Sequence, residues 1–416
     1  MKFDNIKQVS PLTYTFTLSP THVAYANTLR RLIMTGVEGV AFRADMVKGT
    51  TTDVTIRENT TPMTNEMLAH RIGLLTIAGK EPLKWNSEQY TFRLSAKGNK
   101  DTPKDIFAGD FIVTEVIPTE DAPVQVPTAK FFPPHPITGD TCLIATLYPG
   151  ETQKLELVAK ASMGTGREHA RFQPTSQCTY EYTRDPDPAK LESQFNKWLV
   201  DAKKVNPDDI SKDPVAKATL DREFNTMEVS RCYLQDERGE PTSFDFTVES
   251  VGPLDVPYIV QRACDVGEAM VARYVNIDKA DDKALSDEMR IAPSSSRVRG
   301  FDFLIRGHDH TLGNLIQTYL VENHIDTVDT TKVKITYAGY TVPHPLRDEV
   351  LIRIGVEDGN EFTARKAFAE ACRGCVDIFH TMRQTWMQAT GKPKTVTLRR
   401  KVTSAVPTAT TASSQK

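Results

Sequence analysis

The sequence predicts an α+β protein in which two related modules form an intramolecular pseudo-dimer, with a mixed, β-rich insert domain in the first module. The first observation is a repeated pattern, Thr28-Leu29-Arg30-Arg31-Leu32-Ile33 and Thr311-Leu312-Gly313-Asn314-Leu315-Ile316. The second is that each copy follows an alternating segment, at 14–18 and 301–305, and opens a helical pattern. A pattern repeated over such a separation indicates one module used twice.

The first module begins with a strand and a helix. Ser19 is expected as the N-cap, Pro20 as the first helical residue and Gly36 as a left-handed stop. An apolar stripe at helical spacing runs between them. A strand-like run follows at 40–47, and a shorter helix is expected at 65–75.

Residues 80–240 have a different character. They are rich in proline and charge and carry short alternating segments, which predicts a mixed sheet with long loops. Part of 187–227 is expected to be helical, although the sequence does not define how 187–240 folds.

Both modules close with the same order of elements. Residues 244–251 alternate strictly and precede a helix at 257–275, while 350–356 alternate and precede a long helix at 361–388. The apolar residues of the long helix are spaced 4, 3, 4, 3, 4, which is typical of a seam for a partner helix. They are Phe368, Cys372, Cys375, Phe379, Met382 and Trp386.

These elements define the expected domains. Residues 1–47 and 241–276 form the first dimerisation module, 48–240 the insert domain and 298–390 the second dimerisation module. Residues 277–297 are expected as a flexible linker, and 391–416 as a largely disordered Thr/Ser/Ala-rich tail. The residues expected to pair the modules are Leu29, Leu32, Ile33, Thr311, Leu312, Gly313, Leu315, Phe368, Phe379, Met382 and Trp386.

Composition narrows the class of protein. The formal net charge is −3, whereas proteins that clamp nucleic acid directly usually carry a basic excess. No window is long and apolar enough for a membrane span, and the N-terminus lacks the apolar core of a secretory signal. Six scattered cysteines do not make a disulfide framework, so we expect a reducing, cytosolic or nuclear compartment.

At this point four blocks resemble a known family, the alpha-type assembly subunits of multisubunit RNA polymerases. These are the bacterial alpha N-terminal domain, the archaeal D subunit and the third subunit of eukaryotic polymerase II. Ala26–Leu32 is similar to the family's signature helix, and Glu66–Leu74 is similar to its helix leading into the insert. Gly164–Pro174 is similar to the family's long insert loop, and Glu249–Gly252 to its returning strand.

The second half, from about Ser296 to Thr390, resembles the small partner of that subunit, the archaeal L subunit or the eleventh subunit of polymerase II. The matching blocks are His308–Leu315 and Tyr337–Leu346. In cells these two subunits are separate chains, and their fusion resembles what large DNA viruses of eukaryotes carry. The resemblance therefore implies a viral polymerase, acting in the host cytoplasm, at a viral factory or in the virion, with the nucleus as the alternative.

The resemblance also implies a role and partners. The chain would be a non-catalytic platform that docks the largest and second-largest polymerase subunits and small accessory subunits, without sequence-specific nucleic-acid binding or membrane contact. No cofactor is expected, because residues 80–141 contain no cysteine for the zinc loop of eukaryotic third subunits. The residues expected to contact partners are Asn27, Arg30, Arg31, Gly164, Gly166, Glu168, His169 and Arg171.

Other functions remain as alternatives. His308, Asp309, His310 and His344 could serve a metal-dependent hydrolase, although Asp309 also suits a helix N-cap. Cys372 and Cys375 form a Cys-x-x-Cys pair without a second pair, so we interpret them as packing residues. The Gly164–Pro174 loop lacks the Gly-Lys-Ser/Thr close of a P-loop and is interpreted as a partner-contact loop. A nucleic-acid-binding adaptor outside any polymerase is the third hypothesis.

Overall fold

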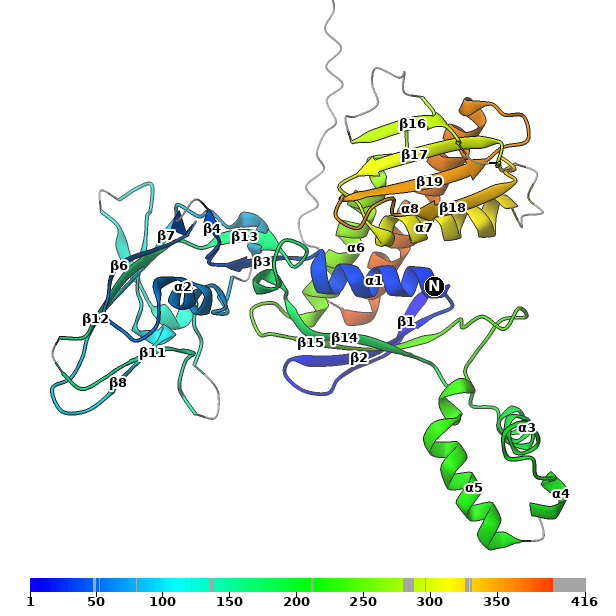
Figure 1. The fold of residues 1–416 in the computed structure, drawn as a ribbon, viewed down its shortest axis with the longest axis horizontal. Coiled ribbons are helices and arrows are strands. Elements are labelled where there is room, and N and C mark those ends of the chain that lie inside the picture. Colours follow the sequence, from blue (N-terminus) through cyan, green and yellow to red (C-terminus); the bar gives the residue numbers. More distant parts are fainter. Residues whose placement is uncertain are drawn as a thin grey trace, which may run out of the picture.

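The computed structural model describes residues 1–47, 50–51, 53–79, 81–120, 122–134, 138–150, 152–210, 213–279, 288–295, 297–325, 329 and 331–391. Figure 1 shows two sheets on either side of a central group of helices, with a β-rich lobe at one side and a small helical unit at the other. None of the helices in the described ranges combines the length and apolar character of a membrane span.

The first sheet is antiparallel, in the order β1-β2-β15-β14. Its strands are β1 (Lys2–Gln8), β2 (Thr13–Ser19), β14 (Thr175–Tyr182) and β15 (Phe244–Ser250). The strict alternation at 244–251 appears as expected, because Phe244, Phe246 and Val248 are buried and the residues between them are more exposed.

Helix α1 (Val23–Thr35) starts later than the sequence predicts. Ser19 is the last residue of β2, where it pairs with Lys2, and His22 is the N-cap, accepting a hydrogen bond from the Ala24 amide. Gly36 does end the helix, but in a right-handed conformation with a φ of −96°. The chain passes almost directly into β3 (Glu38–Ala41), so no left-handed turn is needed.

The second sheet has the order β16-β17-β19-β18 and is also antiparallel. Its strands are β16 (Met289–Pro293), β17 (Gly300–Arg306), β18 (Tyr337–Thr341) and β19 (Glu349–Gly355). The segment 277–297, predicted as a flexible linker, therefore contributes an edge strand; its residues 280–287 and 296 lie outside the described residues. The same holds for 392–416 of the predicted tail.

Three long helices lie between the two sheets together with α1. They are α6 (Val256–Ala272) and α8 (Glu361–Thr390), which are close to the expected bounds, and α7 (His310–Leu320). A short π-helical turn, Val321–Ile325, continues α7. Asp309 caps α7 by accepting the Thr311 amide, so the N-cap interpretation of Asp309 is confirmed.

One hydrophobic core includes residues from both halves of the chain. Trp386 on α8 makes edge contacts with Phe3 and Phe16 of the first sheet, at centroid distances of 5.0 Å each, and its indole N–H donates to the Pro257 carbonyl at 3.0 Å. Gly267 on α6 lies directly under the Phe379 ring of α8. The elements on both sides of the segment 277–297 thus bury their apolar faces against each other.

The β-rich lobe has a separate core. Its main sheet has the order β10-β9-β7-β12-β6, and α2 (Asn65–Gly73) packs on β6. The strands are β6 (Val54–Asn59), β7 (Tyr90–Lys97), β9 (Ile112–Glu115), β10 (Val124–Val126) and β12 (Lys154–Ala159), with the pairs β8 (Lys104–Phe107) and β11 (Leu143–Leu147), β3 and β13 (Ser162–Thr165), and β4 (Met46–Val47) and β5 (Thr50–Thr51).

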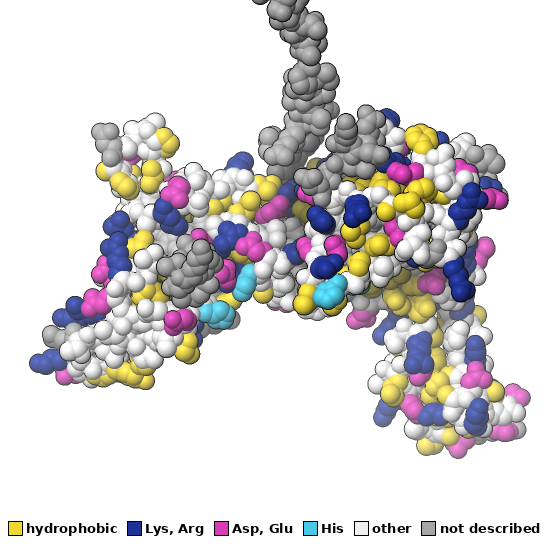
Figure 2. Space-filling view, turned by 45° about the horizontal axis from the view of Figure 1, so that its top comes forward, with side chains coloured by type: hydrophobic (Ala, Val, Ile, Leu, Met, Phe, Trp, Pro, Cys, Tyr) yellow, Lys and Arg dark blue, Asp and Glu magenta, His cyan; other side chains and the backbone are white. Residues whose placement is uncertain are grey.

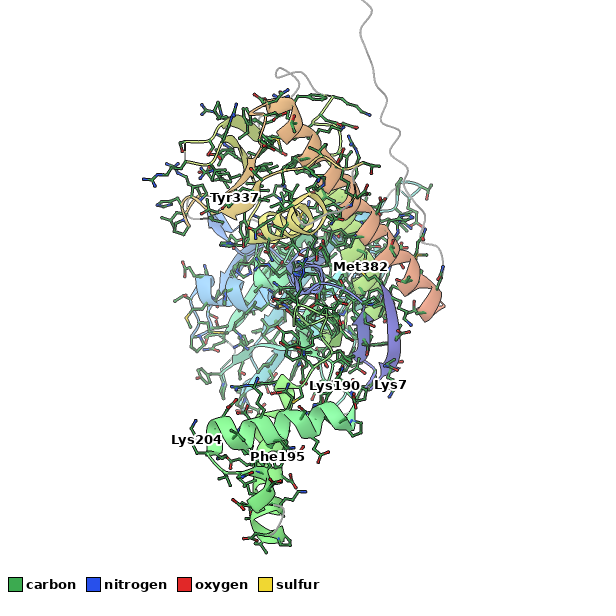
Figure 3. All side chains as sticks on the ribbon, turned by 90° about the vertical axis from the view of Figure 1, so that its right-hand side faces the viewer. Lys7, Lys190, Phe195, Lys204, Tyr337 and Met382 are labelled. Atoms are coloured by element: carbon green, nitrogen blue, oxygen red, sulfur yellow. The ribbon has the colours of Figure 1, made fainter. Side chains whose placement is uncertain are left out.

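Residues 187–231 form a small helical unit, which we call the appendage. It comprises α3 (Pro188–Trp198), a π-helical turn (Leu199–Lys203), α4 (Pro207–Ile210) and α5 (Pro214–Met227), around Phe195, Leu199 and Phe224. Figure 3, which labels Phe195 in the appendage and Met382 on α8, shows the appendage at the far end of the molecule from the second sheet. Short 3₁₀ turns occur at Pro82–Lys84, Ala108–Asp110, Thr128–Lys130, Ala170–Phe172 and Val229–Arg231.

The segment 48–240, predicted as one insert domain, thus contributes to three parts of the molecule. The described residues from Thr50 to Thr165, together with β3 and β4 from the predicted first module, build the β-rich lobe, β14 completes the first sheet beside β15, and the appendage lies between these two strands in the sequence. The alternation in β14 is interrupted by a register shift between Thr175 and Gln177, which weakens its signal in the sequence.

Candidate functional site at the junction of the two halves

The two copies of the repeated pattern lie next to each other, because α1 packs on α7. The predicted pairing residues are placed in or beside the shared core: Thr311 is half-buried and the others are buried. The buried ones are Leu29, Leu32, Ile33, Leu312, Gly313, Leu315, Phe368, Phe379, Met382 and Trp386.

Gly313 has a steric reason to be glycine. A β-carbon at this position would lie 2.4 Å from Cδ2 of Tyr340 and 2.9 Å from a methyl group of Val350. The close neighbours are side chains of β18 and β19 rather than a backbone. The glycine therefore lets α7 lie flat on its own sheet.

Arg30 and Arg31 have different surroundings. Arg31 reaches across the junction, donating to the Thr311 hydroxyl at 2.8 Å and forming an ion pair with Asp309 at 3.2 Å. Arg30 stays on its own helix, donating to the Asn27 side chain at 2.9 Å and contacting the Met34 sulfur at 3.3 Å. The structure thus uses Arg31 to join the halves and leaves Asn27 and Arg30 half-exposed beside each other.

The loop after β13 is fixed by its own side chains. Glu168 pairs with Arg43 through both oxygens, at 2.7 and 2.8 Å, and the Arg43 guanidinium lies over the Phe172 ring. This arrangement lowers the pKa of Glu168, chiefly through the hydrogen bond from Arg43. The predicted contact residue Glu168 is therefore engaged within the chain.

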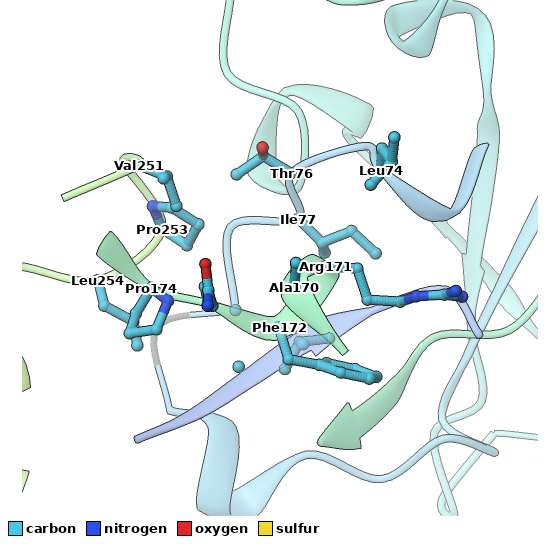
Figure 4. Close-up of a pocket in the computed structure, with 14 residues that line it drawn as sticks. Leu74, Thr76, Ile77, Ala170, Arg171, Phe172, Pro174, Val251, Pro253 and Leu254 are labelled. Atoms are coloured by element: carbon cyan, nitrogen blue, oxygen red, sulfur yellow. The ribbon is translucent and has the colours of Figure 1, made fainter. Parts of the chain in front are cut away.

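His169 and Arg171 also have internal partners. The His169 ring accepts the Arg171 amide at 3.1 Å, and the Arg171 side chain, 2% exposed, donates to the Phe42 carbonyl at 3.0 Å and pairs with Asp45 at 2.8 Å. Arg171 also borders an apolar cavity of about 190 Å³ beside Phe172 and Pro174, which Figure 4 shows in close-up.

The two loop glycines lie at close contacts. A β-carbon on Gly164 would meet the Phe172 ring at 2.7 Å, and one on Gly166 would meet the Met34 carbonyl oxygen at 2.8 Å. Both glycines thus let the loop approach α1 and the 3₁₀ turn. Their role in this structure is internal packing.

Arg167, in the same loop, was not predicted as a contact and spans the junction. It donates to the Gly307 carbonyl at 2.8 Å and forms an ion pair with Asp348, so the loop of the first half holds two loops of the second half. The sequence shows only that an arginine stands between Gly166 and Glu168. Its partners lie far along the chain, so no local pattern predicts the contact.

Further polar contacts between the halves also escaped sequence reasoning. The Tyr25 hydroxyl donates to Glu322 at 2.7 Å, and burial followed by this hydrogen bond raises the pKa of Tyr25. In addition, Arg383 of α8 donates to Asp265 of α6 at 2.9 Å.

The candidate metal ligands do not converge. Asp309 caps α7, the His344 ring accepts the Leu346 amide at 3.1 Å, and the His310 ring lies 3.4 Å from the Tyr340 hydroxyl. Burial, followed by the nearby Arg167 and Arg273, lowers the pKa of His308. Within the described ranges, no three His, Cys, Asp or Glu side chains form a group that could hold a metal ion.

The Cys-x-x-Cys pair lies inside the shared core. Cys372 and Cys375 are fully buried free thiols on α8, and burial raises the pKa of each. The interpretation of both as packing residues is confirmed. Such thiols are inert, because the reactive thiolate form is disfavoured.

A groove opens on the surface where the halves meet, with a volume of about 430 Å³; we call it the junction groove. The groove is lined by Leu32, Val266 and Met270 and by a set of charged side chains. Figure 2 shows the mixed basic and acidic character of the described surface on one face of the molecule. The charged residues of the groove are Arg31, Arg167, Arg262, Arg273, Arg306, Glu38, Glu288 and Asp309.

The helices of both halves of the chain bury their apolar faces in one shared core. Comparison with known proteins gives the family. Family models described as the RNA polymerase Rpb3/Rpb11 dimerisation domain match residues 15–269 and, separately, 301–385. The chain belongs to this family.

Individual relatives align with about three fifths of the chain and with most of their own length. The chain is 26% identical to subunit Rpo3 of the DNA-directed RNA polymerase of Methanothermobacter thermautotrophicus, over 63% of this chain and 93% of the relative. It is 26% identical to subunit 3 of the DNA-directed RNA polymerases II, IV and V of Arabidopsis thaliana, over 60% and 83%. It is 27% identical to subunit RPB3 of the DNA-directed RNA polymerase II of Schizosaccharomyces pombe, over 60% and 78%.

These relatives support a non-catalytic assembly subunit of a multisubunit DNA-directed RNA polymerase. They give no support to the hydrolase or the separate nucleic-acid adaptor.

Proposed function

We propose that this chain is the assembly platform on which the largest and second-largest subunits of its polymerase dock. Its two modules clasp each other as an intramolecular pseudo-dimer and present a composite surface to those partners. The observation that carries the proposal is the single apolar core to which α1, α6, α7 and α8 all contribute. An interface that resembles a domain core is typical of permanent, obligate pairs.

The proposal assigns the repeated helices to pairing and the surrounding polar residues to docking. Residues 1–47 and 241–276 act as the first dimerisation module and 298–390 as the second, with β14 added to the first sheet. Asn27 and Arg30 are the outward contacts on α1. Arg31 and the Gly164–Arg171 loop, which are engaged within the chain, set the shape of the surface around them.

We further propose that the chain is a natural fusion of the two subunit types, because both family models match in order along one polypeptide. Joining the modules raises their effective mutual concentration to roughly the millimolar range, so pairing does not depend on the supply of a second chain. A fusion of this kind fits a large DNA virus, acting in the host cytoplasm or carried in the virion. Small accessory subunits would join through the β-rich lobe.

Co-purification tests the platform. The tagged full-length chain, expressed with the other polymerase genes of its source, should bring down two much larger subunits together with transcription activity. The free chain should show no nucleotidyl transfer by itself. Recovery of the chain without the large subunits, under conditions where they are soluble, would contradict the proposal.

A further inference from the structure

Among the described side chains that line the junction groove, arginines outnumber carboxylates. Five arginines line it against three carboxylates, Glu38, Glu288 and Asp309. Arg262 is neutralised by Glu38 through a bidentate pair at 2.7 and 2.9 Å, and Arg31 by Asp309. These two arginines are structural.

The remaining arginines are less completely paired. Arg167 pairs with Asp348 at the rim, while Arg273 and Glu288, both well exposed, approach only to 3.5 Å. Arg306, at the exposed end of β17, forms no ion pair among the described residues. A surface pair at 3.5 Å contributes little, so within the described ranges the charges of Arg273 and Arg306 are only weakly opposed.

The groove also has apolar lining residues. Val266 and Met270 of α6 and Leu32 of α1 line it together with the arginines, and burial lowers the pKa of the adjacent His308. An occupant that complements this surface carries carboxylates next to an apolar side chain.

From this geometry we propose that the junction groove binds an acidic segment of one of the large polymerase subunits, with Arg306 and Arg273 pairing its carboxylates and α6 receiving an apolar side chain. The site exists only where both halves meet, because Arg273 belongs to the first half and Arg306 to the second. Binding of the segment therefore requires that the two halves are packed against each other. This inference rests on the proposed platform function and adds the partner's chemistry.

The groove's chemistry favours a protein segment over a nucleic-acid backbone. Three carboxylates lie among the arginines, and closely spaced phosphates would meet them as like charges at several points. A protein segment can place its few carboxylates opposite Arg273 and Arg306 alone. The whole chain, with a net charge of −3, adds no long-range attraction for polyanions.

The test uses the full-length chain co-expressed with the large subunits. The variant is Arg306→Glu, and the matched control is Arg290→Glu, an exposed arginine on the neighbouring strand β16 that does not line the groove. Both changes alter the net charge equally, so they differ only in place. Arg306→Lys keeps the charge, and thermal melting of each isolated variant checks the fold.

We expect Arg306→Glu to weaken the complex by about tenfold or more, with Arg290→Glu close to wild type and Arg306→Lys intermediate. The wild-type complex should weaken as ionic strength rises from about 0.05 to 0.5 M, and the Arg306→Glu complex should respond less. Equal binding of all variants, in a complex that still forms, overturns the groove assignment and leaves the platform standing. Absence of any complex with the wild type contradicts the platform itself. Loss of the difference after nuclease treatment also overturns the proposal, because nucleic acid would then be the occupant.

Discussion

Helices α1 and α7 carry the same pattern and differ at its two middle positions. The leucines and isoleucines at matching places are buried in both helices. At the middle positions α1 has Arg30 and Arg31, whereas α7 has Gly313 and Asn314. The shared residues contribute to the common core. The differing residues give each helix a separate role: on α1, Arg30 is half-exposed and Arg31 contacts the other half, whereas Gly313 lets α7 pack closely on its own sheet.

Because of this difference, neither half could take the place of the other at the junction. Arg31 finds Asp309 and Thr311 at the start of α7, and Gly313 admits the Tyr340 ring. An assembly of two copies of the first half would lack both partners. The asymmetry favours the pairing of unlike modules.

The shared positions give the largest expected effects. Leu29→Ala and Leu312→Ala should each destabilise the fold by about 2–5 kcal/mol, because both side chains are fully buried. Urea unfolding measures this, and Leu346→Ala serves as control, since Leu346 is 89% exposed. If each variant shifted only one of two separate transitions, the halves would have independent cores.

The third position of the pattern should separate the two helices. Gly313→Ala should cost about 1–3 kcal/mol in spite of a better helix propensity, because the added carbon overlaps the Tyr340 ring. Arg30→Ala, the equivalent change in α1, should stay within about 0.5 kcal/mol. Denaturant midpoints of the two variants give the comparison, and equal values would remove the steric explanation.

The fourth position tests the contact across the junction. Arg31→Met should lower the free energy of unfolding by about 0.5–1.5 kcal/mol, whereas Asn314→Met in α7 should leave it nearly unchanged. A double-mutant cycle of Arg31→Met with Thr311→Val isolates the contact itself. Additive effects in the cycle would show that Arg31 does not depend on Thr311.

Asp309 should give the smallest effect, visible through pH. Burial opposes ionisation of its carboxyl group, but hydrogen bonds from Thr311 and the charges of Arg31 and Arg167 prevail and lower its pKa. The folded protein therefore gains stability from Asp309 above the unfolded pKa of about 3.9 and loses it as pH falls through the lower folded pKa.

The variant Asp309→Asn keeps a cap acceptor and removes the charge. The free energy of unfolding of the wild type should exceed that of the variant by less than about 1 kcal/mol near neutral pH. This difference should disappear below about pH 4. Urea unfolding at a series of pH values measures the gap. A gap that widened toward low pH would mean that the carboxylate is destabilising.

The sequence predicted those features that have a short-range pattern. The strand at 244–250, the seam on α8 and the Asp309 cap all follow from periodicity or local hydrogen bonding. The start of α1 was wrong because Ser19 and Pro20 also satisfy the rule for a helix start, while Ser19 is held in β2 by its pairing with Lys2.

Long-range features were missed for a physical reason. β16 lies in a charged segment, and only pairing with β17 identifies it as a strand. Likewise, Arg167 and Tyr25 gain their significance from Asp348 and Glu322, which are distant in sequence. Local patterns determine which face of an element is apolar, but not which distant polar groups meet across it.

The most direct test is to cut the chain between its halves. A protease site introduced between Lys279 and Glu288, cleaved in the purified protein, separates the modules covalently and leaves the core residues Ile277 and Met289 unchanged. We expect the two fragments to remain together in gel filtration and to come apart only when the protein unfolds. Fragments that elute separately while each stays folded would contradict the clasp.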